Sequence, residues 1–519
     1  MGKIEQRLFY FVLFLFILAL CFVFNNVDPD FFARVMQGDA VLQTGHVLFQ
    51  DPFSYIQTHK WIDHEWGSGV IFALIQNTFG YGGQLFLKGI ILFLIIYFII
   101  EIININPKMQ NKPLNFLFFV FVVYSFQTLL INGIRCHFFT FLHFTIFLYI
   151  LELVRKQDKD KLLYLMPFMM IFWANIHGGC VSGIGLLIMY AIGEALNRKS
   201  FVKYLITALA CLSVIIINPY GFEYIKFLLM ATTMHRTGIN EWNALFSTQL
   251  TNLLPVKIFV IGSIILFVEK IFRDIKTKID YTEYITLLVV LYIGLFHIKQ
   301  TPFVVIVAMS FLYSELSFLN ELIKSKTNKN NINSKIGNIA KYIMYSFFIL
   351  ISLLTISTGS FVPKNISYYP YKVVEFIKDN DLKGKLLNEF GIGSYLAYKL
   401  YPQMLIFMDG RYEEVYYDIS VKQNDDFYIP TENWENTLKL DGGADYVLVR
   451  QKFIAYENML NLATEGIYKE IFSDGNFALF CKRELLKPSY MKKNQYEIEY
   501  GQKFFDKIYN FHSITQQHF

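Results

Sequence analysis

The residues best suited to chemistry follow the first apolar stretch of the chain, where Asp28 and Asp30 flank Pro29. A carboxylate beside a hydroxyl can take its proton as a new bond forms. Pro29 favours an extended backbone at Asp28, while Asp30 occupies the N-cap position of a helix expected over 31–43. Capping is compatible with chemistry because a helix N-terminus stabilises a carboxylate. Both residues are therefore candidate general bases.

A second group of ionisable residues lies between two tryptophans, in the segment Trp61–Trp66 with the sequence WIDHEW. Asp63, His64 and Glu65 could hold a cation or orient a substrate. The spacing is not diagnostic of a metal site, because adjacent residues of a helix do not share a face. We expect these three side chains to bind an acceptor or a metal ion.

Cations that could meet a phosphate are found in three separate loops, at Arg135, Arg236 and Lys299. Arginine and lysine stabilise phosphate by charge-assisted hydrogen bonds. His177 precedes Gly178 and Gly179, which allow a close approach of backbone or ligand. We therefore assign all four polar side chains to substrate binding, while a histidine satisfied within the core remains the alternative for His177.

The composition predicts that these residues belong to a membrane protein. The 519 residues are 54% hydrophobic and only 17% charged, whereas soluble domains carry about a quarter charged residues. Apolar segments long enough to span a bilayer recur along the chain, since a span needs about 20 residues. Eleven spans are expected, near 9–24, 84–105, 114–132, 138–154, 162–177, 179–197, 203–218, 256–271, 284–297, 302–323 and 340–361.

Lysine and arginine clusters predict the orientation of these spans. Basic clusters fall in every second loop, which places those loops and the N-terminus in the cytoplasm. The net charge of +5 is spread over these loops and is not the footprint of a nucleic-acid partner. All of the candidate residues then lie in loops or helix ends on the outer side. A polar outer cavity is the interpretation we favour over loops that are simply polar.

The predicted domains follow from this pattern. A transmembrane domain covers 1–361 and includes a first outer loop over 27–83. From 362 to 483 the chain alternates strands with helices, which predicts an outer soluble α/β domain with a parallel or mixed sheet. Its expected elements are helices over 371–379 and 393–401, strands over 385–390, 403–408 and 444–450, and a hairpin over 467–481. A tail of mixed lysine and aromatic character follows over 484–519.

Several short motifs, taken in order with this topology, resemble a known family. They are Asp28-x-Asp30, DPFS at Asp51–Ser54, WIDHEW at Trp61–Trp66, NIHGG at Asn175–Gly179, NPYG at Asn218–Gly221, GSYL at Gly393–Leu396 and DGR at Asp409–Arg411. The set resembles bacterial membrane glycosyltransferases of the GT-C superfamily. More narrowly, it is similar to an uncharacterised subset near the RgtA/B/C/D-like and protein-mannosyltransferase-like groups.

The resemblance implies a multi-pass protein of the cell membrane and an inverting sugar transfer. A polyprenyl-phosphate-linked sugar would be the donor, and a lipid, glycan or protein hydroxyl on the outer face would be the acceptor. The family's acidic base in the first outer loop corresponds to Asp30 or Asp28. Many members have an adjacent Asp-Glu pair there, which this sequence lacks, so the choice between the two carboxylates stays open. No cofactor is assigned, and a divalent cation remains an option for the leaving phosphate.

Two other classes of function are compatible with the sequence. A transporter or flippase of lipid-linked sugars would carry charges deep within its helices. A non-catalytic scaffold with a GT-C-like fold would present the C-terminal domain without a site for a lipid phosphate.

Overall fold

The computed structural model describes residues 3–107, 109, 114–233, 240–247, 253–326 and 334–486. The chain forms two compact units. A helical unit contains Met1–Asp28 and His64–Lys364, and a mixed unit contains Pro29–Asp63 and Asn365–Phe519. The two units are described separately below.

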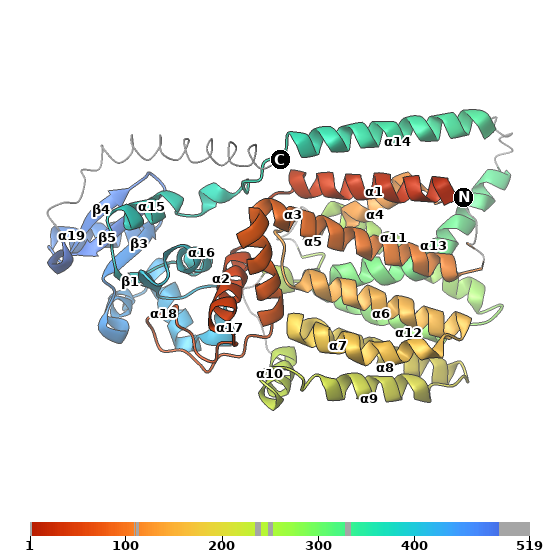
Figure 1. Cartoon of the computed structure of the whole chain (residues 1–519), viewed down its shortest axis with the longest axis horizontal. Helices are drawn as coiled ribbons and strands as arrows, with labels where there is room; N and C mark the ends of the chain where they lie inside the picture. Colours follow the sequence, from red (N-terminus) through yellow and green to blue (C-terminus); the bar gives the residue numbers. More distant parts are fainter. Residues whose placement is uncertain are drawn as a thin grey trace. The chain divides into compact units, whose positions relative to one another are not determined.

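The helical unit consists of apolar helices, most of which run alongside one another (Figure 1). They are α1 (Lys3–Val23), α3 (Trp66–Ile105), α4 (Phe116–Ser125), α5 (Gln127–Ile131), α6 (His137–Gln157), α7 (Leu165–Ile176), α8 (Val181–Leu196), α9 (Val202–Val214), α10 (Phe222–Thr233), α11 (Leu254–Asp274), α12 (Tyr281–Phe296), α13 (Thr301–Lys326) and α14 (Ser334–Ser357). Every predicted span coincides with one or two of these helices.

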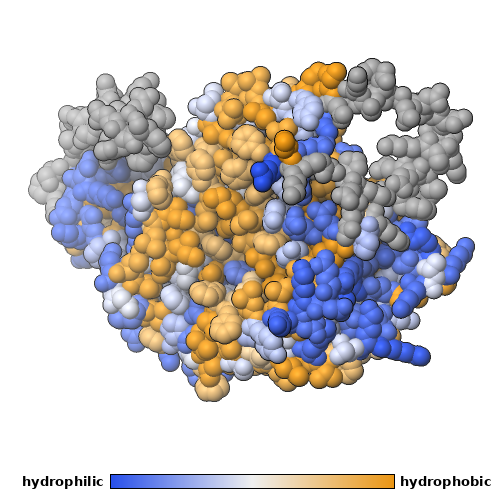
Figure 2. Space-filling model, turned by 45° about the vertical axis from the view of Figure 1, so that its right-hand side comes forward, coloured by the Kyte–Doolittle hydropathy of each residue, from blue (hydrophilic) through white to orange (hydrophobic). Residues whose placement is uncertain are grey.

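Among the described residues, five helices are long and apolar enough to cross a membrane. They begin at Ile4, Trp66, His137, Gly178 and Ile339. Large apolar side chains such as Phe168, Leu209 and Ile343 are exposed on the helices, and hydrophobic residues cover a broad part of the surface (Figure 2). A bilayer is the natural solvent for such a surface, so this is a membrane protein. The full count of eleven crossings stays a prediction.

Helix α3 is longer than the predicted span because two helices meet at Gly80. This glycine has φ of 61° and ψ of −162°, a conformation that side chains with a Cβ rarely adopt. The first part of α3 starts directly after Glu65 and the second part forms the predicted span over 84–105. The bend thus connects the WIDHEW motif to a membrane helix.

Small residues let the helices of this unit pack closely, as is common in membranes. A Cβ at Gly193 of α8 would overlap Thr282 of α12. A Cβ at Gly294 of α12 would likewise overlap Val304 of α13. These contacts fix the neighbours of α12, whose C-terminal end precedes Lys299.

The mixed unit is built on a five-stranded sheet with the order β2-β1-β3-β5-β4. Its elements are α2 (Pro29–Thr44), α15 (Tyr371–Asp379), β1 (Gly384–Leu387), α16 (Phe390–Leu400), β2 (Met404–Ile406), α17 (Tyr412–Val415), α18 (Asp418–Tyr428), β3 (Tyr446–Arg450), α19 (Ile454–Thr464), β4 (Tyr468–Ser473) and β5 (Phe477–Lys482). Strand β1 is parallel to β2 and β3, whereas β5 is antiparallel to β3 and β4. The predicted mixed sheet with its C-terminal hairpin is confirmed.

Part of the predicted first outer loop, 27–83, belongs to this mixed unit. Ser54 forms an isolated parallel bridge with Ile406 of β2, and Phe32 of α2 packs its ring 5.1 Å from that of Tyr395. The contacts therefore group Pro29–Asp63 with the C-terminal residues. Of the predicted tail, 487–519 lies outside the described residues.

Candidate functional site

In the helical unit, Asp28 belongs to a cluster of four charged side chains from four segments. Arg135 Nε lies 2.9 Å from Asp28 Oδ1, and Arg135 Nη1 lies 2.7 Å from Glu241 Oε2. Lys299 Nζ lies 3.0 Å from Glu241 Oε1. The order along the cluster is thus Asp28, Arg135, Glu241, Lys299, with carboxylates and cations alternating. We call these four residues the anion cluster, because Arg135 and Lys299 can bind an anion such as a phosphate.

Backbone packing brings Asp28 and Arg135 together. A Cβ at Gly133 would stand 2.7 Å from Asp28 N, so only glycine allows the two segments to approach this closely. Lys88 of α3 is buried and donates hydrogen bonds to the carbonyls of Leu130 and Asn132, at 2.7 and 2.8 Å. A buried ammonium needs such partners, and here it fixes the backbone just before Arg135.

Glu241 and Lys299 are aligned by contacts between two short 3-10 turns, Asn240–Trp242 and Ile298–Gln300. Ile298 N donates to Asn243 O at 3.0 Å. Lys299 Nζ also stands 5.7 Å from the centre of the Trp242 ring, a distance typical of cation–π contacts.

The cluster keeps Glu241 ionised. Burial alone would raise the pKa of this carboxyl, but Lys299 and Arg135 act more strongly and lower it from 4.5 to about 2. Both cations are thereby held in place by a permanent negative charge.

A second polar group of the helical unit consists of His64, Glu65 and His177, whose ligand-type atoms lie within 4.8 Å of one another. His64 Nε2 and His177 Nε2 lie 3.3 and 3.2 Å from Glu65 Oε1. We call these three residues the imidazole cluster. Burial is the main cause of the lowered pKa of His177 and favours the neutral form of the ring.

The NIHGG motif positions His177. Gly179 N donates to His177 Nδ1 at 3.0 Å, and Thr140 Oγ1 lies 2.7 Å from the same nitrogen. A Cβ at Gly178 would stand 2.9 Å from His64 Cδ2. Both glycines of the motif are thus needed for the imidazole cluster to form.

These contacts decide whether the imidazole cluster fits a metal ion. Because Nδ1 of His177 accepts from a backbone N–H, the proton of the neutral ring is on Nε2, which faces Glu65. A metal-bound histidine normally donates its other N–H to an acceptor; Thr140 Oγ1 could accept it only if the hydrogen bond from Gly179 N to Nδ1 were lost. The cluster therefore fits two imidazoles donating to one carboxylate better than a metal centre.

Three of the motifs lie next to one another in the helical unit, although they are far apart in sequence. In the helical unit, Trp66 Nε1 donates to Asn175 Oδ1 at 3.1 Å, and Asn175 Nδ2 donates to Ile217 O at 2.8 Å. Asn218 Nδ2 in turn donates to Ala174 O at 3.4 Å. WIDHEW, NIHGG and NPYG thus form one assembly.

In the mixed unit, DPFS and DGR meet in the same way around Arg411. Arg411 is fully buried and contacts Asp409 Oδ1 at 2.8 Å and Asp51 Oδ1 at 2.7 Å. Trp61 lies 5.0 Å from the guanidinium. Burial lowers the pKa of Arg411, but Asp409 and Asp51 raise it well above its ordinary value. Asp51 of the DPFS motif thus pairs with a buried cation.

Asp30 and Asp63 also lie in the mixed unit. Asp63 Oδ1 is 3.3 Å from Arg34 Nη1, and Arg34 Nη2 is 3.3 Å from Glu414 Oε1. Helix α2 begins at Pro29, so Asp30 is in its first turn and not at the predicted N-cap position. Its Oδ1 would lie 3.1 Å from a Cβ at Gly410. The predicted Asp63, His64 and Glu65 triplet is therefore divided, with Asp63 paired to Arg34 and the other two in the imidazole cluster.

Arg236 lies outside the described residues. The main residue missed as a site candidate is Glu241, although its position beside Trp242 in a predicted outer loop was a signal. Lys88 was also missed, and a lysine within an otherwise apolar span is a signal in itself.

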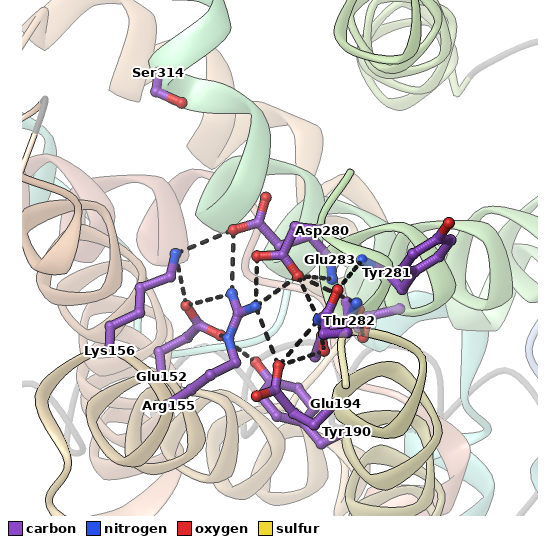
Figure 3. Close-up of polar contacts among 12 residues, drawn as sticks. Glu152, Arg155, Lys156, Tyr190, Glu194, Asp280, Tyr281, Thr282, Glu283 and Ser314 are labelled. Carbon is purple, nitrogen blue, oxygen red and sulfur yellow. Dashed lines mark hydrogen bonds and ion pairs between the residues drawn. The ribbon is translucent and has the colours of Figure 1, made fainter. Parts of the chain in front are cut away.

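Another group of charges lies at the helix ends that the predicted topology places in the cytoplasm (Figure 3). Arg155 is at its centre, 3.0 Å from Glu152 and 2.6 Å from Asp280. Glu283 is 3.1 Å from the same guanidinium. Each of these charges has an opposite partner, and the group joins α6 to the start of α12. We interpret it as a structural clamp and not as a path for a solute.

Comparison with solved structures identifies the fold. An archaeal oligosaccharyltransferase, AglB from Archaeoglobus fulgidus in complex with an inhibitory peptide and a dolichol-phosphate, matches with a TM-score of 0.59 and 11% identity. The match covers 94% of this chain and 76% of that chain. The chain has the fold of these enzymes. Because AglB belongs to the GT-C superfamily, the resemblance seen in the motifs is confirmed for the fold.

Two further structures of the Archaeoglobus fulgidus oligosaccharyltransferase agree. The apo form matches with a TM-score of 0.55 and 10% identity, over 84% of this chain and 69% of that chain. The form tethered to an acceptor peptide containing the NVT sequon matches with 0.53 and 11%, over 85% and 69%. No protein-family model and no curated protein matches the sequence.

Proposed function

We propose that this protein is an inverting membrane glycosyltransferase that transfers a sugar from a polyprenyl-phosphate donor to an acceptor hydroxyl on the outer face. The observation that supports it most is the anion cluster, which joins a candidate base to two cations from other segments. The shared fold with an oligosaccharyltransferase bound to dolichol-phosphate adds support, since a lipid-linked donor fits a membrane-embedded enzyme.

The order of charges in the anion cluster supports a division of roles. Asp28, at one end, would take the proton of the acceptor hydroxyl as its oxygen bonds to the anomeric carbon. Arg135 and Lys299, farther along, would stabilise the phosphate that leaves with the electron pair of the broken bond. Acceptor and leaving group would then occupy opposite faces of the sugar, which gives inversion.

The other polar residues would bind the substrates. His64 and His177 present N–H groups around Glu65, a set that can exchange hydrogen bonds with sugar or acceptor hydroxyls. Arg236 is a further cation for the phosphate. In the mixed unit, Asp63 would bind the acceptor together with Arg34, with which it forms an ion pair. The α/β region would bind the acceptor or a partner. Asp30, beside the DGR turn, remains the second candidate base.

Separate Asp28→Asn and Asp30→Asn variants test the assignment of the base. Each keeps the size of the side chain and removes its charge. We expect Asp28→Asn to lower transfer by about 10²–10⁴-fold, measured as surface glycan in cells that express each variant at the wild-type level. We expect Asp30→Asn to lower transfer less. Wild-type glycosylation by both variants would show that neither carboxylate is the base.

A further inference from the structure

We infer that Arg135 takes the place of a divalent cation between Asp28 and Glu241, so that the anion cluster binds its phosphate without a metal ion. The inference rests on the proposed function, because it concerns how the same site holds its donor.

The first step is the geometry of the guanidinium. Two carboxylates from separate segments approach one positive group, at 2.9 Å for Asp28 and 2.7 Å for Glu241. A magnesium ion held by the same oxygens would lie about 2.1 Å from each of them. The ion and Arg135 would therefore compete for the same position.

The second step is the balance of charge. Asp28 and Glu241 carry two negative charges, and Arg135 and Lys299 carry two positive charges. The pairing is strong enough to keep the pKa of Glu241 near 2. A divalent ion added here would meet two fixed cations, and nearby like charges oppose one another.

The third step concerns the phosphate. A guanidinium carries its positive charge on a planar fork of N–H donors, and Arg135 lies at ion-pair distance from one oxygen of each carboxylate. A phosphate oxygen would then be attracted by the positive charge of Arg135 and by that of Lys299, whose Nζ lies 3.0 Å from Glu241 Oε1. Arg135 and Lys299 would then supply the positive charge that a divalent metal ion supplies at metal-dependent phosphate sites.

The test uses the purified full-length protein and has two readouts. Binding of Mn²⁺ is followed by electron paramagnetic resonance, and sugar transfer is followed with and without EDTA. For wild type we expect no Mn²⁺ binding at micromolar concentration and at most about a two-fold loss of transfer in EDTA. For Arg135→Ala we expect Mn²⁺ affinity to rise by about ten-fold or more, because two carboxylates lose their cation.

Arg198→Ala is the matched control, since it removes an exposed arginine distant in sequence from the cluster; it should leave both readouts unchanged.

Tight Mn²⁺ binding by wild type, or transfer that stops in EDTA and returns with Mg²⁺, would overturn the inference and leave the proposed function intact. Failure of Arg135→Ala to gain Mn²⁺ would also overturn it. If Arg135→Ala does not fold, the wild-type measurements still decide. Absence of transfer under all conditions would instead contradict the proposed function, while the Mn²⁺ readout would still test the inference.

Discussion

At the scale of residues, several buried charges in the described part of the chain are arranged in ion pairs. Arg411 illustrates the principle, because its guanidinium is fully buried between Asp51 and Asp409. Removing one partner of a buried pair leaves an uncompensated charge, which costs far more than the pair contributes. The same reasoning applies to the anion cluster, where Arg135 and Lys299 compensate Asp28 and Glu241.

Replacing Arg411 with Ala should therefore unfold or weaken the mixed unit. We expect a loss of about 3–5 kcal/mol in the free energy of unfolding, because two buried carboxylates lose their cation. Chemical denaturation of the purified protein measures it. Arg483→Ala, at an exposed arginine of the same unit, should change stability little. Equal stability of the two variants would contradict the structural role of the DGR motif.

The pH dependence of the anion cluster follows from Glu241. The folded protein lowers the pKa of this group from 4.5 to about 2, so its stabilisation is complete above the unfolded pKa and is lost as the pH falls through the folded pKa. The melting temperature of Glu241→Gln should lie below that of wild type by a constant amount from about pH 8 to about pH 5, and the gap should close on further acidification. A gap that widened on acidification would contradict the ion pairs.

These residue contacts mark the limit of what the sequence predicts. That Asp28, Arg135 and Lys299 share the outer side could be predicted from residue type and loop position, and it stays a prediction. Their mutual distances could not, because they depend on Gly133 and on Lys88, which the apolar pattern hides. Asp63 and His64 are neighbours in sequence, yet their side chains have partners in different units, which periodicity alone does not reveal.

At the scale of elements, apolar runs predicted the helices well because hydrophobic length alone specifies a membrane helix. The bend at Gly80 was missed, since it depends on a single backbone conformation with φ of 61°. Alternating strands and helices predicted the sheet of the mixed unit. The pairing of Ser54 with Ile406 was not predictable, because it joins segments that are more than three hundred residues apart.

The loop between α7 and α8 offers a test at this scale. A Cβ at Gly179 would overlap Thr140 and stand 2.6 Å from His177 Nδ1, so Gly179→Ala should destabilise the protein by about 1–3 kcal/mol and lower transfer. Gly185→Ala is the matched control in α8, because a Cβ there would meet nothing within 4 Å. Measurement of the free energy of unfolding and of transfer for both variants checks the prediction. Equal behaviour would show that the imidazole cluster does not depend on this loop.

At the scale of the whole molecule, the account requires the candidate residues to face the outer side. The five native cysteines are buried, so single cysteines placed at exposed positions can report sidedness. An impermeant thiol reagent should label Glu432→Cys in intact cells and should label Lys199→Cys only after the cells are opened. Wild type is the control for background labelling. The reverse pattern would place the anion cluster on the wrong side of the membrane.

The claim that the molecule transfers sugar from a lipid carrier is tested most directly by following the carrier itself. Lipid extracts from cells that express wild type or Asp28→Asn at equal levels would be analysed by mass spectrometry for sugar-loaded and free polyprenyl phosphate. We predict that the variant accumulates the loaded carrier and that its glycan product disappears, because the base is missing while the phosphate site is kept. An unchanged ratio of loaded to free carrier between wild type and variant would contradict the account.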